Sequence, residues 1–211
     1  MSASEYNRDQ LEALLMAQGY LGKLSPARLG EFKQQMGSYI RFREDVAQFH
    51  AQHFSSVCSR KCFLSHTSAC CSREGIATFF ADILINTALS SNDELESLLL
   101  ALSEDRGGFK CVYLTETGCL WRLKPIVCAM FLCKSAQESV LGTDRDLKSR
   151  WDHLKLREKA YTWPDRPVLF DELEAICLEA GFDSPLMYFH RSPGLQRVKA
   201  QSRKRPLPAH R

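Results

Sequence analysis

The sequence predicts a mainly α-helical protein whose helices pack around an irregular, cysteine-rich centre with at most a short β-hairpin. Two observations predict this fold class. Apolar residues recur at helical spacing over most of the chain, and eight of the nine cysteines fall into two blocks on either side of an apolar helical stretch. If the chain folds back at that stretch, the thiols of the two blocks converge.

The composition is that of an ordinary globular chain. Hydrophobic residues make up 45% of the 211 residues and charged residues 25%, and a chain of this length can bury a core without disulfides. The interior therefore does not require the cysteines, and their clustering needs another explanation.

The ends of the chain bear on location and partners. The first ten residues lack the basic region and apolar run of a signal peptide. The longest apolar stretches, residues 76–89 and 95–102, are short or interrupted by polar residues such as Asp82 and Asn86, whereas a membrane span needs about 20 apolar residues. We expect a cytoplasmic protein with no membrane partner, in which clustered cysteines are metal ligands or redox centres rather than disulfides.

The net charge of +3 comes from the C-terminal tail. Residues 191–211 contain seven Lys/Arg and no Asp/Glu, whereas residues 1–190 contain 21 basic and 25 acidic side chains. An acidic domain binds nucleic acid poorly by electrostatics alone, so nucleic acid is disfavoured as a partner. The basic tail could instead contact a protein partner.

Local signals place the helices that precede and join the cysteine blocks. Apolar spacing predicts a helix from Tyr6 to Tyr20. Ser25 and Pro26 are start signals for a second helix, which runs to about His53. Helical periodicity resumes at Ile76, and residues 90–92 break it and cap the next helix.

The second half of the chain begins with a predicted hairpin. Its two arms are residues 111–114 and 118–121, joined around 115–117, and Pro125 opens a helix that carries Cys128. Further helices are predicted for Thr143 to Tyr161, with Leu147, Trp151, Leu154 and Leu156 on its apolar side, and for Leu169 to Glu179, ended by Gly181.

These elements divide the chain into four segments. Residues 1–54 form an N-terminal helical region, and residues 55–135, which contain the eight clustered cysteines, form a metal-binding domain. Residues 136–190 form a C-terminal helical region packed on that centre. Residues 191–211 are a basic, flexible tail, because they lack a sustained apolar stripe.

The chemistry of the clustered cysteines favours metal binding. Thiolates suit zinc, iron and iron-sulfur clusters, which take four sulfur donors in a tetrahedral site. The spacings are C-x3-C, C-x7-CC, C-x7-C, C-x8-C and C-x4-C, with none of the C-x2-C knuckles of zinc ribbons. The candidate metal ligands are Cys58, Cys62, Cys70, Cys71, Cys111, Cys119, Cys128 and Cys133. They could form two four-sulfur sites, or one cluster with cysteines left over.

This order of residues resembles the YkgJ-type cysteine-cluster family, described as zinc- or iron-chelating. The likeness covers the spaced cysteines ending in the pair Cys70-Cys71, the span from Cys111 to Cys119, and then Trp121, Lys124-Pro125, Cys128 and Phe131. It implies a bound zinc or iron, with an iron-sulfur cluster as one form of the iron. It leaves both terminal helical regions unexplained.

The resemblance keeps an enzyme function open, because the family's cysteine module is similar to that of flagellin lysine methylases. A radical-SAM enzyme would show C-x3-C-x2-C, but position 65 is Ser65 rather than cysteine. The chain also lacks a Gly-rich phosphate loop and a nucleophile elbow, and no catalytic residue can be assigned. Three classes remain: a metal-binding or electron-transfer protein, a metal-dependent oxidoreductase or methylase-like enzyme, and a structural zinc module that binds a partner.

Several residues are excluded from the site. Cys177 lies on an apolar helix face and is expected in the core. His50 and His53 are expected on a helix surface, and His66 in a loop. Trp121, Phe131 and Trp151 are expected to be core aromatics, although they could also shield a cluster from solvent.

Overall fold

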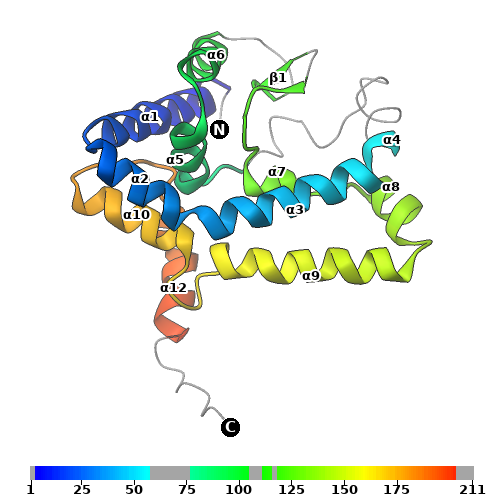
Figure 1. Cartoon of the computed structure of the whole chain (residues 1–211). Coiled ribbons are helices and arrows are strands. Elements are labelled where there is room, and N and C mark those ends of the chain that lie inside the picture. The colour runs from blue at the N-terminus through cyan, green and yellow to red at the C-terminus, as the bar shows by residue number, and fades with distance from the viewer. Residues whose placement is uncertain (1–2, 58–76, 105–110, 116–117, 203–211) are drawn as a thin grey trace.

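The computed structural model describes residues 3–57, 77–104, 111–115 and 118–202, and this part of the chain is mainly helical, as predicted. One group of helices forms a compact body, and two long helices run away from it side by side (Figure 1). The body contains α1 (Ala3–Gly22), α2 (Pro26–Gln35), α5 (Phe80–Leu89), α6 (Asn92–Ser103) and α10 (Leu169–Glu179). The two long helices are α3 (Gly37–His53) and α9 (Arg145–Thr162).

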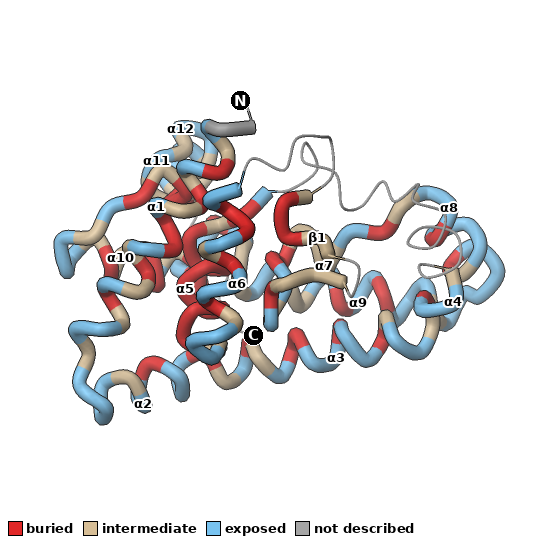
Figure 2. Tube along the Cα trace, turned by 90° about the horizontal axis from the view of Figure 1, so that it is seen from above, coloured by how far each residue is buried: buried red, intermediate tan, exposed pale blue. Residues whose placement is uncertain are grey.

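Helix α5 is the centre of the body. Every residue from Phe80 to Ala88 is buried, and the buried stretch is visible between the surrounding helices in Figure 2. Helix α1 packs against both α5 and α6, and α10 packs against α5 from another side. A helix that is enclosed all round must bury its polar residues too, which for α5 include Asp82 and Asn86.

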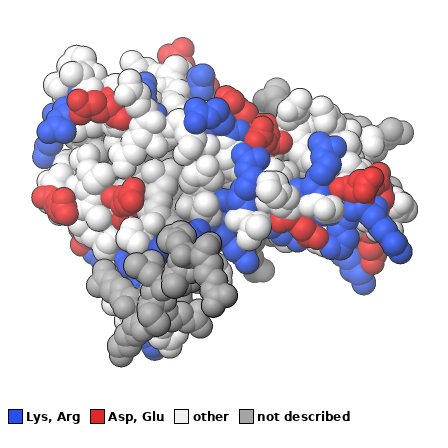
Figure 3. All heavy atoms as spheres, turned by 60° about the horizontal axis from the view of Figure 1, so that its bottom comes forward, with Lys and Arg blue, Asp and Glu red and all other residues white. Residues whose placement is uncertain are grey.

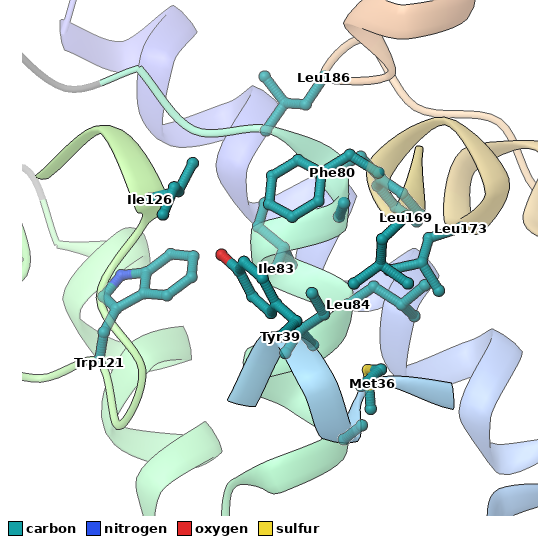
Figure 4. Close-up of a cluster of buried hydrophobic side chains, with 14 of the residues drawn as sticks. Met36, Tyr39, Phe80, Ile83, Leu84, Trp121, Ile126, Leu169, Leu173 and Leu186 are labelled. Carbon is teal, nitrogen blue, oxygen red and sulfur yellow. The ribbon is translucent and has the colours of Figure 1, made fainter. Parts of the chain in front are cut away.

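The body also contains the apolar cluster drawn in Figure 4. Phe80, Ile83 and Leu84 of α5 meet Leu169 and Leu173 of α10, and Tyr39 of α3 lies between them and Trp121 and Ile126, which belong to the cysteine-bearing part of the chain (Figure 4). The core therefore extends without interruption from the body to the segment that follows the hairpin.

Several helix starts have the predicted caps. The hydroxyl of Ser25 accepts a hydrogen bond from the backbone N–H of Arg28, 3.3 Å away. Ser91 accepts from the N–H of Glu94, whose carboxylate in turn accepts from the N–H of Ser91 at 2.7 Å. These bonds satisfy donors that the first turn of a helix leaves unpaired. At the other end, Gly181 adopts φ +80° just after α10, a conformation that favours glycine.

Two predicted helix boundaries were wrong. The single helix expected from Pro26 to His53 is broken at Met36, which ends α2 and precedes α3, and Gly37, a poor helix former, follows. The next helix begins at Phe80 rather than Ile76. Its preceding residue, Phe79, is extended, with ψ 150°.

The two long helices are joined by aromatic side chains. Phe49 of α3 stacks on Trp151 of α9 with ring centres 5.7 Å apart, and Phe42 stacks on Tyr161 at 5.3 Å. Helix α9 also packs against α10. Trp151 and Leu154 are buried as predicted, but Leu156 is 65% exposed, so it does not belong to the apolar side of α9.

Short elements fill the far end of the α3–α9 pair and the region above it. Helix α3 leads into α4 (Ser55–Val57). The predicted hairpin is confirmed, with strands β1 (Leu114–Thr115) and β2 (Gly118–Cys119). It is followed by α7 (Ile126–Met130), α8 (Lys134–Ala136) and a π-helical turn, η3 (Gln137–Leu141).

The C-terminal region is more ordered than predicted. Helix α11 (Tyr188–Arg191) is followed by α12 (Pro193–Ser202), although the tail was expected to be flexible from residue 191. The ammonium of Lys199 bonds to the carbonyl of Phe189 at 3.3 Å and pairs with Asp171, which fixes α12 to the body without an apolar stripe. Residues 203–211 lie outside the described part, and the four predicted segment boundaries stay predictions.

None of the described helices is long and apolar enough to cross a bilayer. Lys/Arg and Asp/Glu side chains are interleaved on the face shown in Figure 3. On α9, for example, Asp152 pairs with both Lys148 and Lys155. Among the described residues, that face therefore carries charges of both signs.

Candidate metal centre

The hairpin holds two of the predicted ligands. Leu114 lies opposite Cys119 across the two strands, and Thr115 lies opposite Gly118. Cys111 precedes β1, and its carbonyl accepts from the N–H of Leu114 at 3.1 Å, which forms a turn. Gly118 adopts φ +122°, which side chains rarely permit, and so allows the chain to enter β2. Cys111 and Cys119 thus come from the two arms of one small hairpin, and both are half-buried.

The buried phenol of Tyr113 connects these two cysteines. Tyr113 is 3% exposed, and its hydroxyl donates to the side-chain oxygen of Gln10 at 3.0 Å. Burial raises the pKa of Tyr113 well above its usual value, and negative charge on Tyr6, Cys111 and Cys119 raises it further. Cys111 is two positions before Tyr113 in the sequence, and Cys119 lies opposite Leu114, the residue after Tyr113, across the hairpin.

The phenol of Tyr6, on α1, connects the hairpin with α7. Burial raises the pKa of Tyr6, and negative charge on Cys111 and Cys128 raises it further. Cys128 lies in α7, 17 positions after Cys111 in the sequence. The charges of Cys111 and Cys128 thus act on Tyr6, whereas those of Cys111 and Cys119 act on Tyr113.

Cys133 is placed differently. It precedes α8, with φ −66° and ψ 158°, and its carbonyl accepts from the N–H of Gln137 at 3.0 Å. Helix α8 lies beside α4 at the far end of the long helices, whereas the hairpin lies above α7 (Figures 1 and 2). No described contact links Cys133 to the other three cysteines.

The other four predicted ligands, Cys58, Cys62, Cys70 and Cys71, lie outside the described residues, as do His66 and Ser65. Within the described ranges, no three Cys, His, Asp or Glu side chains are close enough to hold a metal ion together. The described cysteines are therefore at most part of a site, and the predicted convergence of eight thiols stays a prediction.

His50 and His53 are not the helix-surface residues that we expected. The Nε2 atom of each is buried, with no hydrogen-bond partner in the part of the chain that the structure describes. The ring of His50 packs against Trp151 at 5.5 Å, and that of His53 against Phe49 at 4.9 Å. Burial lowers the pKa of His50, and the charge of Lys124 lowers it further. The ring of His50 thus belongs to the aromatic packing between α3 and α9, whereas that of His53 packs on its own helix.

The remaining excluded residues are placed as follows. Cys177 is fully buried in α10, where burial and the charge of Glu174 raise its pKa to about 12, so it is a core thiol as predicted. Trp121 and Trp151 are core aromatics, 5% and 2% exposed. The prediction for Phe131 was wrong. It is 48% exposed and follows the end of α7.

Sequence analysis missed three buried polar residues that contact the backbone between Cys119 and Cys128. Arg43 of α3 and Asp82 and Asn86 of α5 each bond to a main-chain atom of residues 123–126. The available signal was the presence of Asp82 and Asn86, one helical turn apart, in an otherwise apolar stretch. From the sequence alone, Asp82 and Asn86 indicate only that this apolar stretch is interrupted and does not span a membrane.

A groove of about 430 Å³ lies elsewhere, between α3 and α9. Its walls include Gln48, Gln52, Arg150 and His153, and Arg157 pairs with Asp45 across it at 2.7 Å. None of the described cysteines lines this groove. The groove is therefore not a substrate pocket beside the described candidate metal ligands.

Comparison with known proteins adds no family to this geometry. No protein-family model matches the chain, no curated protein is significantly similar to it, and no solved structure matches it. The likeness to the YkgJ-type family therefore rests on the cysteine order and flanking residues alone.

Proposed function

We propose that this protein binds zinc or iron through clustered cysteine thiolates, in the manner that its resemblance to the YkgJ-type family implies. The observation that carries the proposal is that Cys111 and Cys119 come from the two arms of one hairpin, that Cys128 follows in α7, and that the charges of these thiols act on the phenols of Tyr6 and Tyr113. An interior of this composition does not need thiols there, and thiolates are good ligands for both metals.

The surroundings of these cysteines fit a bound cation. Tyr6 and Tyr113 are buried phenols whose protons are held tightly, so they offer hydroxyl dipoles but no charge. Burial near such neutral groups disfavours an isolated thiolate, and a cation coordinated by several thiolates removes that cost. The fourth and further donors would come from the first block of cysteines, Cys58 to Cys71. When bound, zinc would give a closed structural site, and iron would add redox chemistry.

The direct test is elemental analysis and an optical spectrum of the whole chain, purified without oxygen. We expect stoichiometric zinc, or iron with visible absorption. Separate Cys111→Ser, Cys119→Ser and Cys128→Ser variants should each weaken metal binding by more than about 100-fold, since even outer-shell changes cost about 10- to 100-fold. Cys177→Ser is the matched control, because that thiol lies in the core of α10, and it should retain its metal.

Two results would contradict the proposal. One is metal-free protein whose cysteines are paired as disulfides. The other is a metal content that survives all three serine substitutions as well as it survives Cys177→Ser. If metal is present, its removal should increase proteolysis between Cys58 and Cys71, because bringing distant thiolates together couples binding to the folding of the chain between them.

A further inference from the structure

The segment Leu123–Ile126 connects the two parts of the candidate centre. It begins four residues after Cys119, at the end of the hairpin, and it ends two residues before Cys128, in α7. Most of it belongs to neither a strand nor a helix, so regular structure does not satisfy its backbone groups. Buried main-chain N–H and C=O groups without partners are costly, and this segment must obtain its partners elsewhere.

Three side chains from the two central helices supply those partners. The side-chain oxygen of Asn86 accepts from the N–H of Leu123 at 2.9 Å. One carboxylate oxygen of Asp82 accepts from the N–H of Ile126 at 2.9 Å. The guanidinium of Arg43 donates to the carbonyl of Lys124 at 2.6 Å. The remaining residue, Pro125, has no N–H to satisfy. Arg43, Asp82 and Asn86, which we call the clamp, therefore fix the segment at three successive points.

The clamp is itself held rigidly. Arg43, Asp82 and Asn86 are 4%, 3% and 1% exposed. The second oxygen of Asp82 accepts from the N–H of Phe79 at 3.3 Å, and a second nitrogen of Arg43 donates to the hydroxyl of the fully buried Tyr39 at 2.8 Å. The opposite charges of Arg43 and Asp82 also attract each other. Its anchor points are thus the packed helices α3 and α5.

Burying three polar side chains is a costly way to stabilise a core, since apolar residues of similar size pack there without a desolvation cost. Apolar contacts are not directional, so they do not specify the position of an irregular backbone. Hydrogen bonds to backbone N–H and C=O groups are directional and do specify it. Outer contacts of this kind orient metal ligands in other sites.

We propose that Arg43, Asp82 and Asn86 are positioning residues that set Cys128 and α7 relative to the hairpin cysteines, so that all of them can reach one metal site. The inference rests on the proposed metal binding. The clamp does not touch the metal, and it acts through the backbone of residues 123–126. Loss of the clamp's hydrogen bonds should change the geometry of the metal ligands, whereas a loss of stability elsewhere in the core should not.

The test compares two substitutions at one position. Asp82→Asn keeps an oxygen that can accept from Ile126, whereas Asp82→Leu removes it. We expect Asp82→Leu to weaken binding of Co²⁺, used as a spectroscopic probe of thiolate coordination, by about 10- to 100-fold and to shift its absorption bands. Asp82→Asn should largely restore both. Asn86→Leu, which removes only the bond to Leu123, should act in the direction of Asp82→Leu.

The matched control is Ile83→Ala, a cavity in the same helix. It should lower the melting temperature without shifting the Co²⁺ bands of the folded protein. If Asp82→Leu and Asn86→Leu have the same Co²⁺ affinity and the same absorption bands as Ile83→Ala, the clamp does not position the ligands. If Asp82→Leu does not fold, Asn86→Leu decides by the same comparison.

A metal-independent measurement separates failure of this inference from failure of the proposed function. In metal-free protein, amide exchange at Leu123 and Ile126 and the alkylation rate of Cys128 should rise in Asn86→Leu relative to Ile83→Ala. Unsubstituted protein that binds no Co²⁺, zinc or iron would overturn metal binding, and with it a metal-positioning role. Unchanged exchange and alkylation would overturn the clamp even if the metal binds.

Discussion

Two buried carboxyl groups, in two regions of the molecule, show how differently a buried acid can be accommodated. Glu174 lies in α10 with a fully buried side chain, and one of its oxygens has no hydrogen-bond partner among the described residues. Asp82 lies in α5, and both of its oxygens accept backbone N–H groups while Arg43 supplies a positive charge.

The pKa values of these two groups follow from their partners. Burial raises the pKa of Glu174 to about 9, with only partial compensation from backbone hydrogen bonds. Burial also raises the pKa of Asp82, but Arg43 and the N–H groups of Ile126 and Phe79 oppose it and hold the value at about 7. Glu174 is therefore a neutral acid at neutral pH, 3.0 Å from the Nδ1 atom of His190, whose own pKa is lowered by burial. The difference shows that the surroundings of Asp82 favour its charged form more than the surroundings of Glu174 do.

The largest expected effect comes from the aromatic residue that connects the two regions. The ring of Phe170 contacts Tyr39, the partner of Arg43, at 5.4 Å and Phe189, the neighbour of His190, at 6.2 Å. Phe170→Ala should lower the free energy of unfolding by about 3–5 kcal/mol, because it leaves a cavity in a closely packed core. Urea denaturation followed by circular dichroism and tryptophan fluorescence measures this.

The two probes should give one midpoint if the regions unfold together. Separate midpoints would show that the regions are independent. The surface control Leu156→Ala, at a side chain that is 65% exposed, should change stability by less than about 0.5 kcal/mol.

A smaller, pH-dependent effect is expected from Glu174→Gln. The folded protein keeps the proton of Glu174 up to about pH 9, whereas an unfolded glutamate loses it near its ordinary pKa of 4.5. The folded state therefore binds more protons in this interval, and its stability falls as pH rises through it. The glutamine variant lacks this loss, so its stability relative to the unsubstituted protein should increase between pH 5 and pH 9, by less than the limit of about 1.36 kcal/mol per pH unit.

Chemical denaturation at pH 5, 7 and 9 gives this difference directly, and the contribution of Asp82 cancels because both proteins contain it. A difference that stays constant with pH would mean that Glu174 is ionised in the folded protein. The contrast between the two carboxyls would then be wrong.

The smallest effect is expected at a site remote from both carboxyls. Ser91→Ala removes the cap of α6 and should cost about 1 kcal/mol. This loss of unfolding free energy should be the same at pH 5 and pH 9. A pH-dependent difference in Glu174→Gln can then be assigned to Glu174 itself. Ser97→Ala, on the exposed side of the same helix, is the matched control and should stay within about 0.5 kcal/mol. A cost at Ser91 that grows with pH would indicate that titration affects the whole fold rather than one group.

Much of the helical architecture could be predicted from local signals. The caps Ser25 and Ser91, the hairpin and the end of α10 at Gly181 depend on residues close together in sequence, and the structure has each of them. The errors were of another kind. The break at Met36 and the exposure of Leu156 and Phe131 depend on which faces meet other helices, and periodicity alone does not specify that.

The sequence by itself determined the helical class, the main helices and an inventory of cysteines whose chemistry favours metal. Only the tertiary structure decided that the charges of Cys111 and Cys128, from the hairpin and from α7, both act on Tyr6 of α1, while Cys133 has no described link to them. It also decided that Arg43, Asp82 and Asn86 face the backbone of residues 123–126. The physical reason is that capping and periodicity act within a few residues, whereas the contacts of Arg43, Asp82 and Asn86 join positions 37 to 81 residues apart, which come together only when α3 and α5 pack.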